Sequence, residues 1–378
     1  MSAGTARDRA DGRGLRVSAR LAVRRLGALR FRSYLRADLA FDGRPVALHG
    51  PNGAGKTNLI EAISLLSPGR GLRGAASEEL ANTRAPGGWR VTAEIESLDG
   101  AHEVATWGLG GGRSVEIDAK PAPQAALGGV LRVLWLTPAM DRLWMEAASE
   151  RRRFLDRATL SLAPGHAEAA SAYERGLRDR GRLLREGSRD RAWYEALEAG
   201  MAEAGAALIA NRRATLARLA EAPPAPGFPA AELTLAREGP ETPSELAAVW
   251  RDDRPRDFAA GRTLIGPHRD DLAATYADKG VPARLASTGE QKAMLISVTL
   301  ANAFAVAGLV GAAPVLLLDE VAAHLDADRR AALYDALTTL GTQAFLTGTG
   351  AELFDTLGDR AALMRVAARE DGSLIPTD

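Results

Sequence analysis

The chain has 378 residues, with 48 basic and 48 acidic side chains and no formal net charge, so any nucleic-acid surface must be a local patch and not a global field. The absence of cysteine excludes disulfide frameworks, thiolate zinc sites and cysteine nucleophiles, and it predicts a reducing, cytoplasmic location. The length allows two or three domains, and we expect no membrane partner, on the interpretation that no apolar run approaches the length of a transmembrane helix.

The chain begins with an Arg-, Gly- and Asp-rich segment, residues 1–20, that lacks the apolar core of a secretory signal. We interpret this segment as a flexible leader. The next segments, 26–31 and 37–41, are predicted strands on either side of a turn, and they precede the first motif.

Residues 50–57 read Gly-Pro-Asn-Gly-Ala-Gly-Lys-Thr, which fits the phosphate-binding pattern G-x-x-x-x-G-K-[ST]. The glycines let backbone N–H groups face the β- and γ-phosphates, Lys56 adds a positive charge, and the Thr57 hydroxyl can ligate Mg²⁺. The apolar segment before the loop and the helical segment after it supply the strand–loop–helix context that the motif requires. The residues that we expect to contact ATP here are Gly50, Pro51, Asn52, Gly53, Ala54, Gly55, Lys56, Thr57 and Asn58.

Further strands are predicted after this loop and its helix. Residues 91–96 and 114–118 alternate with a period of two, and a Gly-rich turn at 110–112 precedes the second segment. These segments predict a β-subdomain, and the apolar residues 130–136 predict one more buried strand.

The composition then shifts, from residue 141 to about 219, to Ala, Leu, Arg and Glu with few β-branched residues, which predicts helices. No heptad pattern is sustained there, so an extended coiled coil is not expected. Three consecutive arginines, 151–153, point in different directions on a helix, and we interpret them as a solvated surface and not as a DNA contact. We therefore expect a helical lobe, residues 141–261, inserted into a core formed by residues 21–140 and 262–378.

A short polar turn, Ser287-Thr288-Gly289-Glu290, opens an apolar helix late in the chain. Ser287 can be an ordinary N-cap with Glu290 in the capping-box position, or the turn can be an anion site at a helix N-terminus. ABC-type ATPases carry their signature loop at this distance before an acidic strand, and that loop caps the γ-phosphate of the partner subunit. The placement therefore implies an ATP-bound dimer.

The acidic strand follows as residues 315–318, Val-Leu-Leu-Leu, which end in Asp319 and Glu320. Four apolar residues in a row predict a buried parallel strand. Asp319 is then placed to hold Mg²⁺, and Glu320 to polarise the attacking water. A helix at 329–340 and a final strand at 343–346 complete the predicted elements.

The chain resembles the RecF family of SMC-like ABC ATPases in several motifs that occur in the family's order. The motifs are residues 29–34 (Leu-Arg-Phe-Arg-Ser-Tyr), the phosphate loop, 150–157 (Glu-Arg-Arg-Arg-Phe-Leu-Asp-Arg), 266–272 (Gly-Pro-His-Arg-Asp-Asp-Leu), Ser287 and 319–326. The resemblance implies an α/β fold, with an ABC-type P-loop ATPase core, a β-subdomain and an inserted α-helical lobe.

The same resemblance implies an ATP-dependent DNA-binding protein of recombinational repair and replication-fork maintenance. Such a protein dimerises with ATP on single-stranded, gapped or duplex DNA, cooperates with RecO and RecR, and helps to load RecA. It would be a weak, DNA-stimulated ATPase with no nuclease activity. Lys56 and Glu320 would be catalytic, and Thr57 and Asp319 would hold Mg²⁺. The further residues that it places near the nucleotide or the dimer interface are Arg32, Ser287, Gly289 and Asp326.

The sequence departs from the general ABC pattern at three places. Thr288 stands where the first signature glycine is usual, no glutamine loop follows the 130–136 strand, and Thr347-Gly348-Thr349 replaces the switch histidine. Either threonine is a candidate γ-phosphate sensor. The alternative function, a nucleotide-binding subunit of an ABC transporter, should have retained the glutamine loop and the histidine. His268 and its neighbouring acids favour a polar turn over a metal cluster.

Overall fold

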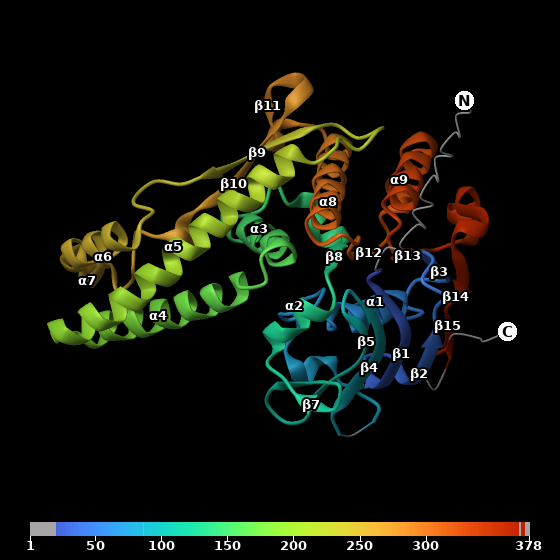
Figure 1. Cartoon of the computed structure of the whole chain (residues 1–378), viewed down its shortest axis with the longest axis horizontal. Coiled ribbons are helices and arrows are strands. Elements are labelled where there is room, and N and C mark those ends of the chain that lie inside the picture. Colours follow the sequence, from blue (N-terminus) through green and yellow to red (C-terminus); the bar gives the residue numbers. More distant parts are fainter. Residues whose placement is uncertain (1–19, 86, 370–371, 375–378) are drawn as a thin grey trace, which may run out of the picture.

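The computed structural model describes residues 20–85, 87–369 and 372–374, in which an arm projects from a core of two sheets (Figure 1). The predicted flexible leader, residues 1–20, lies outside the described residues except for Arg20. The architecture is α/β, as expected, with one parallel and one large antiparallel sheet.

The antiparallel sheet has the strand order β2-β1-β4-β5-β6-β7 and forms the β-subdomain. Its strands are β1 (Ala22–Phe31), β2 (Tyr34–Ala40), β4 (Trp89–Ser97), β5 (Gly100–Gly108), β6 (Arg113–Ile117) and β7 (Lys120–Pro121). The four strands predicted in this region are confirmed. β5 was missed because only its second half is apolar and its alternation is irregular.

The parallel sheet has the order β14-β3-β13-β12-β8. Its strands are β3 (Val46–His49), β8 (Val133–Leu136), β12 (Val315–Leu318), β13 (Ala344–Gly348) and β14 (Ala362–Arg365). The prediction that the strand at 343–346 is the last one was wrong, because β14 and the β15 (Ala367–Arg369)–β16 (Gly372–Leu374) hairpin follow. β14 alternates between half-buried and exposed side chains, a weak signal in sequence.

The parallel sheet separates two hydrophobic clusters. Val315, Leu317 and Phe345 point to the β-subdomain and to the first helix, whereas Leu316 and Leu318 point to the helices on the opposite face. Since successive side chains of a strand alternate between faces, the same short apolar strand contributes to both clusters. This double burial explains why all four residues of β12 are apolar.

The helices of the core pack on this sheet. They are α1 (Lys56–Ser64), α2 (Leu127–Val130), α8 (Thr288–Val310) and α9 (Ala327–Leu340). The 3₁₀ segments are Ser77–Leu80, Gln124–Ala126, Pro138–Arg142, Pro267–Arg269, Ala277–Lys279, Ala283–Leu285, Ala322–His324 and Ala351–Arg360.

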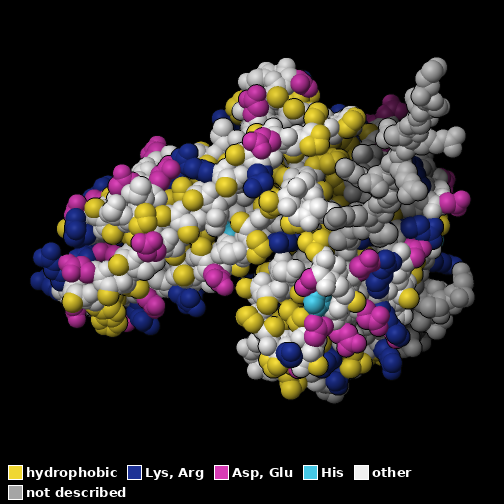
Figure 2. Space-filling view, viewed as in Figure 1, with side chains coloured by type: hydrophobic (Ala, Val, Ile, Leu, Met, Phe, Trp, Pro, Cys, Tyr) yellow, Lys and Arg dark blue, Asp and Glu magenta, His cyan; other side chains and the backbone are white. Residues whose placement is uncertain are grey.

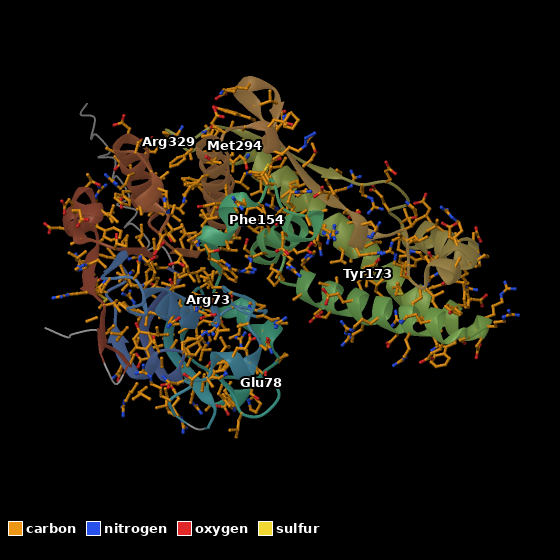
Figure 3. The ribbon with its side chains drawn as sticks, turned by 180° about the vertical axis from the view of Figure 1, so that it is seen from behind. Arg73, Glu78, Phe154, Tyr173, Met294 and Arg329 are labelled. Carbon is orange, nitrogen blue, oxygen red and sulfur yellow. The ribbon has the colours of Figure 1, made fainter. Side chains whose placement is uncertain are left out.

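The arm contains mainly helices. It comprises α3 (Ala148–Leu162), α4 (His166–Glu186), α5 (Arg191–Glu221), β9 (Ala231–Ala236), α6 (Pro243–Asp252) and α7 (Arg254–Ala260). Phe154 of α3 lies where the arm meets the core, and Tyr173 of α4 lies within the arm (Figure 3). β9 pairs with β10 (Asp271–Tyr276), and β10 pairs with β11 (Val281–Pro282), so a small sheet joins the arm to the segment that leads into α8.

α8 corrects the expectation about apolar runs. Residues 288–310 form a helix that is long and apolar enough to cross a membrane by length and composition alone. In this structure, 56% of the most apolar window of the helix is buried inside the protein. Its buried side chains belong to the cluster on one face of the parallel sheet. The apolar run therefore has a packing role in this fold, and the statement that no run approaches this length was wrong.

Candidate nucleotide-binding site

The phosphate loop lies between the end of β3 and the start of α1. Lys56 is the first residue of α1, and its Nζ donates hydrogen bonds to the carbonyl oxygens of Gly50 (2.7 Å) and Pro51 (3.0 Å). Burial lowers the pKa of Lys56, while the negative charges of Glu320 and Asp319 act in the opposite direction. The ammonium group is thus held by loop carbonyls beside the positive end of the helix, where phosphate groups bind.

Glycine is required in this loop by space and by conformation. A Cβ atom on Gly50 would lie 2.1 Å from the carbonyl oxygen of Val366, which approaches from the chain after β14. Gly53 and Gly55 have φ angles of 79° and 107°, in the left-handed region that favours glycine. The loop conformation therefore depends on the two glycines that the motif specifies, Gly50 and Gly55, and also on Gly53, which stands at a position that the motif leaves open.

The two residues predicted to hold Mg²⁺ come from opposite ends of the chain and lie together. The Thr57 hydroxyl donates to Asp319 at the end of β12, with distances of 2.9 Å to Oδ1 and 3.1 Å to Oδ2. A hydroxyl and a carboxylate are hard oxygen donors of the kind that Mg²⁺ prefers. Within the described residues, no group of three or more His, Asp or Glu side chains could hold a metal.

A third side chain, Thr347 at the end of β13, completes this contact. Its hydroxyl donates to Asp319 Oδ1 (2.7 Å) and accepts from the backbone N–H of Glu320 (2.9 Å), and the residue is fully buried. Glu320 has a φ of 53°, an unfavourable value for a residue other than glycine. The hydroxyl of Thr347 is thus engaged with both acidic residues, whereas Thr349 is exposed.

Arg32 and Asn58 lie together on the outer side of α1. Arg32 forms two hydrogen bonds of 2.8 Å with Glu61, a buried carboxylate that also contacts Arg73 at 3.1 Å. Asn58 bonds to Ser33 (2.7 Å) and accepts from Arg73 (2.9 Å).

These side chains line a cavity of about 440 Å³ that reaches Gly53 of the phosphate loop. Arg73 was not singled out in the sequence, because nothing in its neighbourhood resembles a motif. The Tyr34 hydroxyl donates to the carbonyl of Gly55 at 3.1 Å, and burial raises the pKa of this tyrosine. Tyr34 therefore supports the loop from the β-subdomain.

The second group of predicted residues lies apart from the phosphate loop. Ser287 is the N-cap of α8 and forms a full capping box with Glu290, whose carboxylate accepts from the Ser287 N–H at 2.9 Å. Asp326 is the N-cap of α9 and accepts from the N–H of Arg329 at 2.8 Å. Across the part of the chain that is described, no hydrogen bond or ion pair joins Ser287, Gly289 or Asp326 to the phosphate loop.

The segment after β8 connects the two groups. It occupies the position of the missing glutamine loop, and Lys292 of α8 donates to Asp141 at 2.9 Å. The indole N–H of Trp144 donates to the carbonyl of Gln291 at 3.3 Å. β8 belongs to the parallel sheet, so the start of α8 is attached through this segment to the sheet that carries Asp319.

The two remaining motifs, residues 150–157 and 266–272, contact each other. Arg151 forms two hydrogen bonds with Asp271, at 2.8 and 2.7 Å, and Arg152 donates to the carbonyl of Asp270 at 2.6 Å. The interpretation of residues 151–153 as a solvated surface was therefore wrong for the first two arginines. It holds for Arg153, which is exposed.

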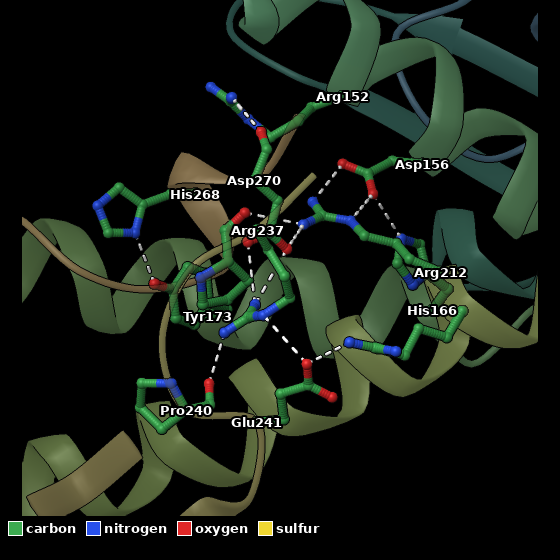
Figure 4. A network of polar contacts seen from close by, with 12 residues as sticks. Arg152, Asp156, His166, Tyr173, Arg212, Arg237, Pro240, Glu241, His268 and Asp270 are labelled. Carbon is green, nitrogen blue, oxygen red and sulfur yellow. Dashed lines mark hydrogen bonds and ion pairs between the residues drawn. The ribbon is translucent and has the colours of Figure 1, made fainter. Parts of the chain in front are cut away.

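The polar turn around His268 belongs to a buried network (Figure 4). Asp270 is 2% exposed and accepts hydrogen bonds from Arg212 of α5 and Arg237 after β9. Arg212 also binds Asp156 of α3, at 2.7 and 3.0 Å. Each acid is paired with arginine, so the network is not a metal site, in agreement with the preference for a polar turn. It connects α3, α5 and the turn before β10, and we call it the joint.

Comparison with known proteins gives the site a family context. The family model described as the RecF/RecN/SMC N terminal domain matches residues 22–373. The chain is 46% identical over 366 residues to the DNA replication and repair protein RecF of Rhizobium etli (strain CIAT 652), covering 92% of this chain and 98% of the relative. It is also 46% identical over 366 residues to the protein of that name from Brucella suis biovar 1 (strain 1330), covering 92% and 95%.

Solved structures resemble this fold over nearly the whole chain. The recombination mediator protein RecF with ATP, in the RecFOR pathway, has a TM-score of 0.84 at 22% identity and covers 96% of this chain and 99% of its own. The Smc head domain of Pyrococcus furiosus has a TM-score of 0.54 at 19% identity and covers 94% and 96%. At these identities the likeness shows the fold alone, and it confirms the expected ABC-type ATPase core.

Proposed function

This chain belongs to the RecF family of SMC-like ATPases, and we propose that it binds and slowly hydrolyses ATP as a DNA-binding protein of replication and repair. The observation that carries the proposal is the contact of Thr57 with Asp319 across 262 positions of sequence. It joins the phosphate loop and the acidic strand into one site. The residues of this site have the chemistry that phosphoryl transfer to water requires.

In this proposal, each side chain of the site has a separate role in hydrolysis. Lys56 and the loop N–H groups bind the β- and γ-phosphates, and Thr57 and Asp319 would hold Mg²⁺. When bound, this ion neutralises charge on the phosphate oxygens. Glu320 orients the attacking water, and Thr347 fixes the backbone of Glu320 and one carboxylate oxygen of Asp319.

Dimerisation with ATP is the second part of the proposal. Thr288 and Gly289 open α8 at a helix N-terminus, and the α8 residues near this start are attached to the ATP-site sheet through Asp141 and Lys292. Ser287 and Gly289 would contact the γ-phosphate of a partner copy, with Asp326 beside that interface. DNA binding is proposed from the names of the relatives. The preference for single-stranded, gapped or duplex DNA, and cooperation with RecO and RecR in loading RecA, are proposed from the resemblance of the motifs to the RecF family.

The transporter alternative predicts different behaviour. A transporter subunit would bind ATP without any response to DNA, and the family membership of this chain argues against it. The test is the affinity for gapped, single-stranded and duplex DNA, measured by fluorescence anisotropy with and without ATP. We expect ATP to raise DNA affinity and DNA to raise the hydrolysis rate.

Lys56→Ala is the control in this test, because it removes the charge that holds the phosphates. The variant should lose ATP binding in a direct titration and, with it, the effect of ATP on DNA affinity. DNA affinity that is the same with and without ATP in the wild-type protein would contradict the proposal.

A further inference from the structure

The strongest unassigned feature of the surface is a row of arginines on α4. Arg175, Arg178, Arg182 and Arg185 follow one another at intervals of three, four and three residues, and all four are exposed. At 3.6 residues per turn this spacing places them within about 80° of the helix circumference, along about 15 Å of its length. We call these four residues the arginine stripe, and Arg189 continues it into the turn before α5.

The opposite side of α4 is packed and fixed. Tyr173, Leu183 and Leu184 are buried, and a Cβ atom on Gly176 would lie 2.3 Å from Met201 of α5, which shows how closely the two helices approach. The stripe is therefore presented on a rigid helix pair.

A fifth arginine of α4 shows the contrast between the two sides. Arg180 is fully buried and binds the carboxylates of Glu198 and Asp257 at 2.9 and 2.6 Å. On the packed side of this helix, the arginine is thus fully paired with acids. The stripe residues are not buried in such a network.

The stripe residues have few competing partners. Arg175 and Arg185 form no ion pair with any of the described residues, while Arg178 and Arg182 contact Glu174 (3.9 Å) and Asp179 (3.2 Å). Both of these pairs are exposed contacts within α4, which contribute little to stability and give way readily to another anion. Lys and Arg side chains are visible along the lower edge and at the free end of the arm (Figure 2).

We propose that the arginine stripe of α4 binds the phosphate backbone of DNA. This inference rests on the proposed DNA-binding function and assigns part of it to a surface. Duplex DNA carries one phosphate per 3.4 Å of axis on each strand, so about four phosphates lie within the length of the stripe. A row of guanidinium groups can bind successive phosphates of the DNA backbone. Such contacts position the DNA but do not select its sequence.

The charge pattern favours DNA over a lipid surface. None of the exposed large apolar side chains of the described structure lies on α4, so the stripe lacks the apolar face that a membrane-surface helix needs. Trp193, at the start of α5, is the exposed aromatic residue nearest in sequence. Anionic vesicles are therefore included in the test.

The test compares two triple variants of the full chain. Arg175→Gln, Arg178→Gln and Arg182→Gln together remove three charges of the stripe, and Arg185 is kept because its side chain lies against Gly181 and Gly261. The control variant removes three exposed arginines elsewhere, Arg36→Gln on β2, Arg90→Gln on β4 and Arg218→Gln on α5. Affinity for a fluorescein-labelled duplex is measured with ATP at several KCl concentrations.

We expect the stripe variant to bind duplex DNA about 10-fold or more weakly, and its salt slope to fall by roughly 2.7 for each stripe of the dimer that contacts the DNA, since each lost phosphate contact contributes about 0.9. The control should keep the wild-type slope, and ATP affinity and ATP-dependent dimerisation should be unchanged in both variants.

Two outcomes would overturn the assignment. One is a stripe variant with the wild-type affinity and slope, and the other is an equal loss in the control. Stripe-dependent binding of phosphatidylserine vesicles, with duplex binding unchanged, would assign the stripe to lipid instead. If the wild-type protein with ATP binds no DNA at all, both the proposed function and the assignment of the stripe fail, whereas wild-type binding that the stripe variant retains overturns the assignment alone.

Discussion

At the scale of single residues, the site is organised around one carboxylate that two threonine hydroxyls reach from different elements. Thr57 approaches Asp319 from the start of α1, and Thr347 approaches it from the adjacent strand β13. Asp319 is 6% exposed, so its orientation is set by these contacts and not by solvent. The positions of Asp319 and of the neighbouring Glu320 are thus coupled through Thr347.

Thr347→Val tests this coupling, because valine keeps the shape of threonine and removes the hydroxyl. We expect the rate constant for ATP hydrolysis to fall by about 10- to 100-fold, since small displacements of catalytic groups have effects of this size. ATP affinity should change little, because Lys56 and the loop are untouched. Thr347→Ser retains the hydroxyl and should restore most of the rate. A valine variant that hydrolyses ATP at the wild-type rate would remove Thr347 from a positioning role.

The residues of the predicted ATP site could be recognised in the sequence because they lie in two local motifs. The loop at 50–57 and the acidic pair at 319–320 each follow an apolar strand, and parallel strands bring their carboxyl ends to one edge of a sheet. Their contact therefore followed from the pattern. The contact of Tyr34 could not be predicted because it depends on how the β-subdomain packs against the phosphate loop, and that of Arg73 because it depends on how the loop after α1 folds back onto this helix.

At the scale of elements, two helices of the arm are joined to the turn that precedes β10 by a network of charges. α3, α5 and the turn before β10 meet through Asp156, Arg212 and Asp270. Breaking one member of such a network leaves an uncompensated buried charge, a costly state. The same turn leads through β10 and β11 to the segment before α8, whose N-cap is Ser287. In sequence, the two motifs involved gave no sign that they contact each other.

His268 gives this joint a pH dependence. Its Nδ1 accepts from the Tyr173 hydroxyl (2.7 Å) and its Nε2 donates to the Thr263 carbonyl (3.1 Å), which fits a neutral ring. Burial lowers the pKa of His268 from 6.5 to about 4. The unfolded chain thus gains a proton at higher pH than the folded one, and stability is lost as the pH falls from 6.5 towards 4.

For this single group the loss amounts to about 3 kcal/mol of unfolding free energy. His268→Gln should therefore show a shallower decline in unfolding free energy between pH 6.5 and 4, as measured by urea titration. The variant is compared with itself across this pH range, so a uniform loss of stability does not affect the result. An unchanged decline would show that another group controls the stability of the joint.

At the scale of the whole molecule, the chain is neutral, and the positive charge that could meet DNA is a local row of side chains. The core holds the ATP site, and the arm carries the arginine stripe on its outer helix. A dimer formed with ATP would present two stripes, which makes DNA binding both tighter and more dependent on salt than binding by one copy. The presence of an inserted helical lobe could be predicted from the sequence, but the packing of its helices against the turn before β10 depends on ion pairs with no local signature.

We propose that ATP joins two copies of the chain through the start of α8, and light scattering in the presence of ATP measures the resulting dimer. Glu320→Gln should bind ATP and form a persistent dimer, because the phosphate contacts remain while the water-orienting carboxylate is lost. Ser287→Arg should bind ATP in each monomer but place a bulky charge where the partner's γ-phosphate must dock. We predict that Ser287→Arg stays monomeric with ATP and loses tight DNA binding. A Ser287→Arg protein that dimerises with ATP like the wild type would contradict the account and leave Ser287 as an ordinary helix cap.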